Sequence, residues 1–137
     1  MPKFTLQLNN QNQLIAPVII TLDNDMPPKN TLQARALFDT GANVSCITEH
    51  GAKHLQLKPI GKVPVATASQ NISQNKYKIK ISLPFPTNDH YTVRMSEILN
   101  IEVLEIQNNP NFDIIIGMDI INLGLLIVSG NTFTFSL

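Results

Sequence analysis

The chain has 137 residues with ten basic and ten acidic side chains, so its formal charge is zero, and 43% of its residues are hydrophobic. This length suits one domain with a core of its own, and the balanced net charge gives no electrostatic indication of nucleic-acid binding. No stretch reaches the roughly 18 uninterrupted apolar residues of a membrane span. We therefore expect neither binding to nucleic acid nor insertion into a membrane.

Two strands are predicted at the start of the chain. Phe4, Leu6 and Leu8 alternate with polar residues, which is the period of a half-buried strand. Residues 18–22 form a compact, largely β-branched run that predicts a second strand. Residues 23–30 are rich in turn formers and contain two consecutive prolines, which cannot donate ladder hydrogen bonds, so they predict a loop.

An acid then follows directly on a third apolar run. The stretch Ala36-Leu37-Phe38-Asp39-Thr40-Gly41-Ala42 predicts a buried strand that ends in a tight turn at Asp39. Burial makes an ionised carboxyl costly unless it is hydrogen-bonded or shared. Gly41 lets the turn fold back so that amide N–H groups point at the carboxylate. Two interpretations are open here: Asp39 is a catalytic acid, or it is an ordinary cap of a strand-ending turn.

Cys46, His50 and His54 follow at intervals of four, and on one continuous helix they could line a face as metal ligands. Cys46 is instead expected in a strand, Gly51 follows His50 where metalloprotease helices carry Glu, and no fourth ligand is evident, so we expect no metal. Nothing nearby orients His50 for a nucleophilic pair with Cys46, so a small buried thiol is the favoured interpretation.

The cysteine count also bears on location. Cys46 is alone, so no intrachain disulfide can form, and a reducing compartment is the simpler inference. The first residues lack the apolar core of a signal peptide. We therefore expect a cytoplasmic protein.

A short helix and a hairpin are predicted next. Thr48 is a suitable N-cap for a helix that closes before Pro59. Residues 63–68 and 76–83 predict two strands joined by a polar turn at 69–71. Lysines 76, 78 and 80 alternate with apolar residues and predict a solvated strand face.

The last part of the chain repeats the earlier pattern of an apolar run and a glycine. The run from Phe112 to Ile121 is rich in isoleucine, breaks at Gly117 and continues into a helix-like pattern. Thr132–Leu137 predicts a closing strand. Two such strand–glycine units suggest one paired architecture.

The two units, in this order, resemble the signature of the retropepsin-like aspartic proteases: an apolar pair, Asp-Thr/Ser-Gly-Ala, and later an apolar triplet ending in Gly. The extension Asn43-Val44-Ser45-Cys46-Ile47 is most similar to bacterial and other non-viral single-domain members, and the resemblance covers roughly residues 14–137. It implies an all-β fold with one or two short helices, the half-barrel of the acid proteases. One domain then spans residues 1–137, with 1–13 as an N-terminal extension or an interface strand.

The resemblance also implies roles for individual residues. Asp39 is the implied catalytic residue, Thr40 and Gly41 support it, and Gly117 belongs to a structural loop packed against it, although a helix-start or turn role for Gly117 is equally open. The family's flap, a hairpin that closes over bound peptide, maps to about residues 63–83, and its tip here lacks the usual glycine. The implied substrate-binding residues are Ala42, Asn43, Ala68, Ser69 and Gln70.

One departure concerns an ion pair. Viral members usually carry an acid soon after the catalytic alanine and an arginine after the second glycine, and the two pair with each other. Asn43 and Met118 stand at these positions here, so both partners are missing together. Whatever stiffness this ion pair gives the dimer must come from elsewhere.

Because the chain carries one Asp-Thr-Gly loop, the resemblance implies a homodimer in which two copies of Asp39 face each other. Two carboxyls about 3 Å apart share one proton and together activate a water that attacks a peptide carbonyl. The predicted function is an aspartic endopeptidase acting on extended polypeptides without metal or organic cofactor. The alternative is a retropepsin-fold dimerisation or peptide-binding module with little or no turnover.

Overall fold

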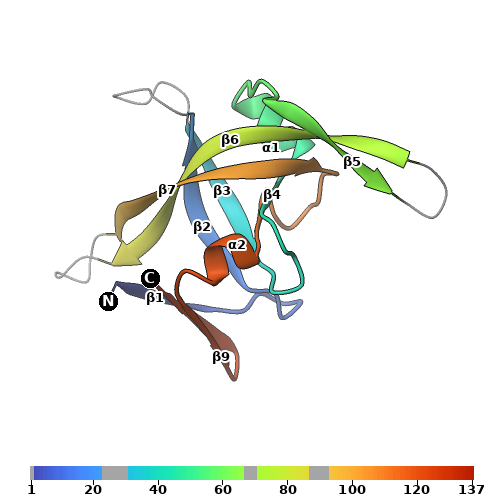
Figure 1. Ribbon diagram of the computed structural model, residues 1–137. Helices are drawn as coiled ribbons and strands as arrows, with labels where there is room; N and C mark the ends of the chain where they lie inside the picture. The colour runs from blue at the N-terminus through green and yellow to red at the C-terminus, as the bar shows by residue number, and fades with distance from the viewer. Residues whose placement is uncertain (1, 23–30, 67–70, 87–92) are drawn as a thin grey trace.

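A computed structural model describes residues 2–22, 31–66, 71–86 and 93–137 of the chain (Figure 1). The strands are β1 (Lys3–Gln7), β2 (Ile15–Thr21), β3 (Thr31–Phe38), β4 (Cys46–Thr48), β5 (Gly61–Ala66), β6 (Asn71–Pro86), β7 (Val93–Ile106), β8 (Ile114–Ile116), β9 (Leu125–Ser129) and β10 (Thr132–Ser136). The helices are α1 (Glu49–His54) and α2 (Met118–Ile121). The predicted all-β class with two short helices is confirmed. No helix among the described residues has both the length and the apolarity to cross a bilayer.

Seven strands form the larger sheet, in the order β2-β3-β8-β4-β7-β6-β5. Residues 19–21 of β2 also pair with residues 80–82 of β6, so the sheet closes on itself as a barrel and β5 extends beyond the closure. β5 and β6 pair antiparallel over residues 61–66 and 71–76, so the predicted hairpin is present, although β5 lies two residues earlier than predicted and β6 begins at Asn71, inside the predicted turn. Its tip at 67–70 and the predicted loop at 23–30 lie outside the described residues.

The two strand–glycine units lie side by side at the centre of this sheet. β3 and β8 are parallel neighbours, with Phe38 opposite Ile116. β4 follows β8 in the sheet and pairs antiparallel with it. The residues that directly follow β3 and β8 therefore lie next to each other at the same end of the sheet, as the paired pattern predicted.

The smaller sheet has the order β1-β10-β9, so the two ends of the chain lie next to each other (Figure 1). Phenylalanines from β1 and β10 pack against Phe38 at the end of β3; the rings of Phe38 and Phe135 have centroids 5.1 Å apart. This aromatic cluster consists of Phe4, Phe38, Phe85, Phe133 and Phe135. Because aromatic rings bury large apolar areas, the cluster fixes the terminal sheet against the strand that leads to Asp39.

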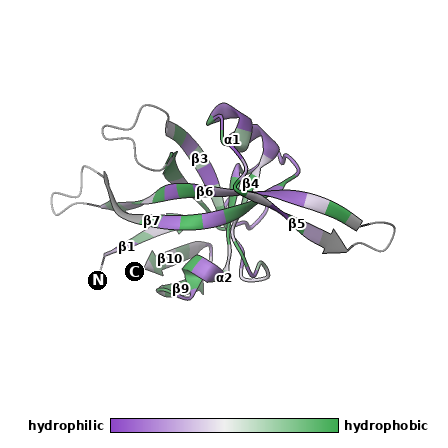
Figure 2. Ribbon diagram, turned by 45° about the horizontal axis from the view of Figure 1, so that its top comes forward, coloured by the Kyte–Doolittle hydropathy of each residue, from purple (hydrophilic) through white to green (hydrophobic). Residues whose placement is uncertain are grey.

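Burial alternates in β6 as the sequence predicted for residues 76–83, with Tyr77, Ile79 and Ile81 buried and Lys78 exposed, and it alternates in β2 as well. In β2, Ala16, Val18 and Ile20 point into the barrel and are buried, while the residues between them are more exposed. The hydropathy colours of Figure 2 alternate along β6 and β7 in the same way. Alternate side chains of a strand lie on opposite faces, so one set fills the core and the other faces solvent.

Candidate functional site

Asp39 lies at the point where β3 leaves the barrel. Its backbone N–H donates to Ile116 O over 3.0 Å, which continues the β3–β8 ladder by one step. Its side chain is half-buried and accepts a hydrogen bond from the Gly41 N–H, with 2.8 Å between N and Oδ1. The Ala42 N–H also donates to Asp39 O, at 3.2 Å. Backbone and carboxylate are therefore both held in a tight turn.

The residues after Asp39 keep the surroundings of the carboxylate open. Thr40, Gly41 and Asn43 are exposed and Ala42 is half-buried. A Cβ on Gly41 would lie 3.1 Å from Asp39 Oδ1, tighter than nearly all real contacts of this kind. The turn therefore presents a carboxylate beside small or exposed residues. We call residues 39–45 the Asp39 loop.

Gly117 lies against the backbone of this loop. A Cβ at Gly117 would stand 2.7 Å from Val44 C and 2.8 Å from Ala42 O, too close for any side chain. The following residue, Met118, donates its N–H to Ala42 O at 2.8 Å. Gly117 is also the N-cap of α2, so it serves as both the loop contact and the helix start.

Ser45 and Asp119 tie the loop to α2. Ser45 is fully buried, and its hydroxyl donates to Asp119 Oδ1 at 2.7 Å while accepting the Gly117 N–H at 3.0 Å. The Ser45 N–H donates to Asp119 Oδ2 at 2.9 Å, and the Ile120 N–H donates to Oδ1 at 3.0 Å. Hydrogen bonds to a carboxylate are stronger than neutral ones, so this cluster fixes the loop relative to α2.

Replacing Ser45 by alanine tests this connection. We expect the free energy of unfolding to fall by about 2 kcal/mol, because a buried N–H of Gly117 and part of the Asp119 carboxylate lose their partner. The measurement is urea unfolding at fixed protein concentration. Ser73→Ala, at an exposed site on β6, is the control and should change little. Equal effects of the two substitutions would contradict the role of Ser45.

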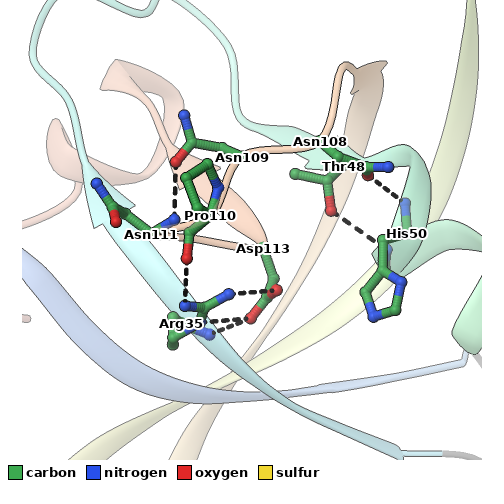
Figure 3. Close-up of polar contacts among 9 residues, drawn as sticks. Arg35, Thr48, His50, Asn108, Asn109, Pro110, Asn111 and Asp113 are labelled. Atoms are coloured by element: carbon green, nitrogen blue, oxygen red, sulfur yellow. Dashed lines mark hydrogen bonds and ion pairs between the residues drawn. The ribbon is translucent and has the colours of Figure 1, made fainter.

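Arg35, in the middle of β3, and Asp113, directly before β8, hold these two strands together (Figure 3). The Arg35 backbone N–H donates to Asp113 Oδ2 at 2.8 Å, and its guanidinium donates to Oδ1 at 3.2 Å. A second guanidinium nitrogen donates to Pro110 O at 2.8 Å, and the Asp113 N–H returns a bond to Arg35 O at 2.8 Å. The pair therefore sets the register of the two strands that carry Asp39 and Gly117 at their far ends.

This pair makes stability depend on pH. Burial alone would raise the pKa of Asp113, but hydrogen bonds from Arg35 and its charge outweigh that effect and lower the pKa below its ordinary 3.8. A lowered carboxyl pKa contributes stability above the ordinary value and loses it as pH falls through the folded-state value. Asp113→Asn should therefore destabilise by about 1 kcal/mol at pH 7, since the Arg35 side chain is half exposed and water screens the pair.

The difference between wild type and Asp113→Asn should shrink as the pH is lowered below about 3.8, measured by urea unfolding across pH. Glu49→Gln is the matched control, because Glu49 forms an exposed ion pair with Lys53 at 3.3 Å that should contribute almost nothing. A penalty for Asp113→Asn that is the same at every pH would show that its charge plays no part.

The predicted capping of α1 is confirmed. Thr48 Oγ1 accepts the Gly51 N–H at 3.2 Å, and the His50 N–H donates to Asn108 Oδ1 at 2.7 Å (Figure 3). Cys46 lies in β4, off the helix that carries His50 and His54. Among the described residues, no group of three or more His, Cys, Asp or Glu side chains is placed to hold a metal ion.

Cys46 is also a poor nucleophile. Burial, and then the negative charges of Asp119 and Asp39, raise the pKa of the Cys46 thiol above its ordinary 9.0. A thiol must ionise to attack, so these surroundings keep it in the unreactive form. The sequence predicted a small buried thiol, whereas Cys46 is only half-buried in β4.

A hollow of about 260 Å³ lies beside the Asp39 loop and the hairpin. Its lining is mostly apolar, with one ion pair between Lys76 and Glu102 at 2.7 Å. The lining residues are Val44, Val63, Lys76, Glu102, Val103 and Leu104. The sequence predicted Lys76 only as part of a solvated face, whereas it is half-buried and paired. The predicted tip residues Ala68, Ser69 and Gln70 lie outside the described residues.

The base of the hairpin is fixed by a tyrosine. Tyr77 on β6 donates its hydroxyl to Glu105 Oε1 on β7 at 2.7 Å, and only 4% of it is exposed. Burial, then this hydrogen bond, raises the pKa of Tyr77 to about 12, so the phenol keeps its proton at any working pH. This bond anchors β6 to β7 directly after residues 71–76, the part of β6 that pairs with β5 in the hairpin.

Comparison with known proteins adds family evidence to this geometry. The family model described as aspartyl protease matches residues 24–120. No curated protein sequence matches the chain. Among solved structures, it is similar to a retropepsin-like aspartic protease from Rickettsia conorii, with a TM-score of 0.64 at 10% identity over 97% of this chain and 89% of that one. It is also similar to the simian foamy virus (mac) protease, with a TM-score of 0.50 at 15% identity over 77% and 91% of the two chains. At these identities the likeness shows the fold alone, and that fold is the retropepsin-like one that the sequence predicted.

Proposed function

Because the chain belongs to the aspartyl protease family, we propose that it is an aspartic endopeptidase that cleaves extended polypeptides as a homodimer. The observation that carries the proposal is the setting of Asp39: a half-buried carboxylate on a glycine turn, hydrogen-bonded by the Gly41 N–H at 2.8 Å. Each chain has one Asp-Thr-Gly turn, so a pair of catalytic carboxyls requires a second copy.

The proposed mechanism follows from the electrostatics of two close carboxyls. They cannot both ionise, so they share one proton. The ionised member takes a proton from a water held between them, and that water attacks the peptide carbonyl. The protonated member donates a hydrogen bond to the oxyanion that forms. No metal or organic cofactor takes part in these steps.

The other residues of the proposed site have supporting roles. Thr40 is exposed beside Asp39 and would hydrogen-bond across the two-fold axis, and Gly41 leaves room at the carboxylate. Ala42 and Asn43 would lie along the substrate backbone. The β5–β6 hairpin would cover the peptide through Ala68, Ser69 and Gln70. Gly117 would hold the Asp39 loop in place through its close backbone contact.

The hollow beside the loop supports a preference for apolar substrates. Val44 follows the proposed peptide-binding residues directly, and Val63 belongs to the hairpin, so the hollow lies between the two. An aliphatic side chain near the cut would bury apolar surface there.

The experiment that tests the function is cleavage of a diverse peptide library by the purified chain between pH 4 and 7.5, with Asp39→Asn beside it. Cuts made only by the wild type support the endopeptidase and give its side-chain preference. The second candidate, a dimerisation or peptide-binding module, is favoured by the absence of glycine from the hairpin tip at 67–70. Peptide binding by both proteins without cuts by either would favour that candidate.

A further inference from the structure

The hollow beside the Asp39 loop contains an ion pair within a mostly apolar lining. Lys76 on β6 and Glu102 on β7 lie 2.7 Å apart, measured from Nζ to Oε2. Val44, Val63 and Leu104 supply the apolar walls around this pair. An apolar hollow with a few placed polar groups selects its occupant by its polar groups as well as by its size. Here those polar groups are a hydrogen-bond donor and an acceptor that lie next to each other.

The strands fix where the two charges lie. Lys76 stands directly opposite Leu104 in the β6–β7 ladder, and Glu102 comes two residues before Leu104 on β7. Residues two apart on a strand share a face, so the pair and this leucine lie on one face of the ladder. The Lys76 side chain is 35% exposed and the Glu102 side chain is 53% exposed. In the free protein, water therefore occupies the hydrogen-bonding positions that the pair leaves unused, and the pair contributes little to stability.

A bound peptide changes the surroundings of the ion pair. The hollow lies between the Asp39 loop and the hairpin, so a substrate side chain that enters it displaces water from both charges. An ammonium has several N–H donors and a carboxylate has several acceptor positions, and their mutual contact leaves most of these unused. Charged groups that lose water without gaining a partner cost free energy. The best occupant therefore offers an acceptor to Lys76 and a donor to Glu102.

We propose that this hollow selects a glutamine side chain of the substrate, whose carboxamide lies across the pair of Lys76 and Glu102. The carboxamide C=O accepts a hydrogen bond from the Lys76 ammonium, and its NH₂ group donates to the Glu102 carboxylate. The aliphatic stem of the glutamine packs against the apolar walls, so the ion pair narrows the apolar preference of the hollow and does not replace it. This inference rests on the proposed function, because it names the substrate side chain that the same site takes.

Other side chains fit the ion pair less well. A substrate glutamate would meet Glu102 with a like charge, and a substrate lysine would meet Lys76 with one. Methionine has nearly the shape of glutamine but lacks the amide donor and acceptor, so both charges would lose water without gaining a partner. A site built to hydrogen-bond its substrate rejects an analogue that lacks the bonding groups. We expect glutamine to be preferred over these three residues by about tenfold, since both charges are partly exposed.

The test is the cleavage rate of the peptide library, compared position by position along the peptide, for the wild type and two variants. At one position the wild type should favour glutamine. Glu102→Gln leaves the positive charge of Lys76 in the hollow, so the preference at that position should change to glutamate. A double variant that exchanges the charges, Lys76→Glu with Glu102→Lys, should keep the preference for glutamine, because a carboxamide can turn over and offer the same two groups. Glu49→Gln is the matched control: it makes the same substitution at an exposed site outside the lining and should keep the wild-type preference.

The outcomes separate this inference from the function. If the wild type cleaves peptides but favours glutamine over methionine and glutamate at no position, the inference is wrong, although the function stands. A preference for glutamine that Glu102→Gln leaves unchanged also overturns the inference, because the preference then comes from another part of the site. If the double variant does not fold, Lys76→Met takes its place, and its preference should change to lysine.

If the wild type cuts no peptide, binding of fluorescently labelled peptides, measured by anisotropy, replaces cleavage in the same comparison. Binding of the glutamine peptide about tenfold more tightly than the methionine peptide, lost in Glu102→Gln, would support the inference while the function fails. Equal binding of the two peptides by the wild type would overturn the inference.

Discussion

Asp39→Asn is expected to reduce peptide cleavage by about 10⁴-fold, the largest effect of any single change in this chain. The substitution keeps the size of the side chain and its ability to accept the Gly41 N–H, so the turn should survive. It removes both the base and the acid, because the two copies contribute the same residue. The measurement is the steady-state rate on a peptide that the wild type cuts.

Two further results distinguish loss of chemistry from loss of structure. The Asp39→Asn dimer should form at least as readily as the wild type at neutral pH, because two facing amides lack the repulsion of two carboxylates. Glu49→Gln removes one negative charge from an exposed position on α1 and should leave the rate unchanged. Cleavage by Asp39→Asn at the wild-type rate would show that another residue performs the reaction.

Gly117→Ala is expected to have the second largest effect. The added Cβ would meet three backbone atoms of the Asp39 loop at 2.7 to 2.8 Å, and backbone cannot rotate away as a side chain can. We expect the free energy of unfolding to fall by about 3 kcal/mol, which is the upper range for overpacking. The remaining folded protein should cleave more slowly, because the shift breaks the bonds from Met118 to Ala42 and from Gly117 to Ser45.

The measurement combines urea unfolding with cleavage rates corrected for the folded fraction. Gly61→Ala is the matched control, since a Cβ at Gly61 meets nothing within 4 Å. It should change stability by less than about 0.5 kcal/mol. A Gly117→Ala protein as stable and active as Gly61→Ala would mean that the loop is not held by this contact.

The sequence predicted the features that depend on neighbouring residues. The alternation along β6, the Thr48 cap of α1 and the turn around Asp39 each follow from a few adjacent side chains, and the structure has them. The strand–glycine units at 39 and 117 also predicted correctly that two distant segments would lie together. The roles of Asp39, Thr40 and the hairpin tip remain predictions that the proposed experiments test.

The tertiary structure decided the contacts between residues far apart in the chain. Ser45 and Asp119 are 74 positions apart, and Arg35 and Asp113 are 78 apart, so nothing in their local sequence indicates the pairing. The isoleucine-rich run before Gly117 predicts a strand, but only the strand order places β8 between β3 and β4, and β7 and β9 were not predicted from the sequence. Local patterns fix which face of a strand is apolar, whereas exposure depends on which strand lies beside it. The sequence therefore predicts the carboxylate on its turn, and the contacts that hold this turn in place arise from the fold.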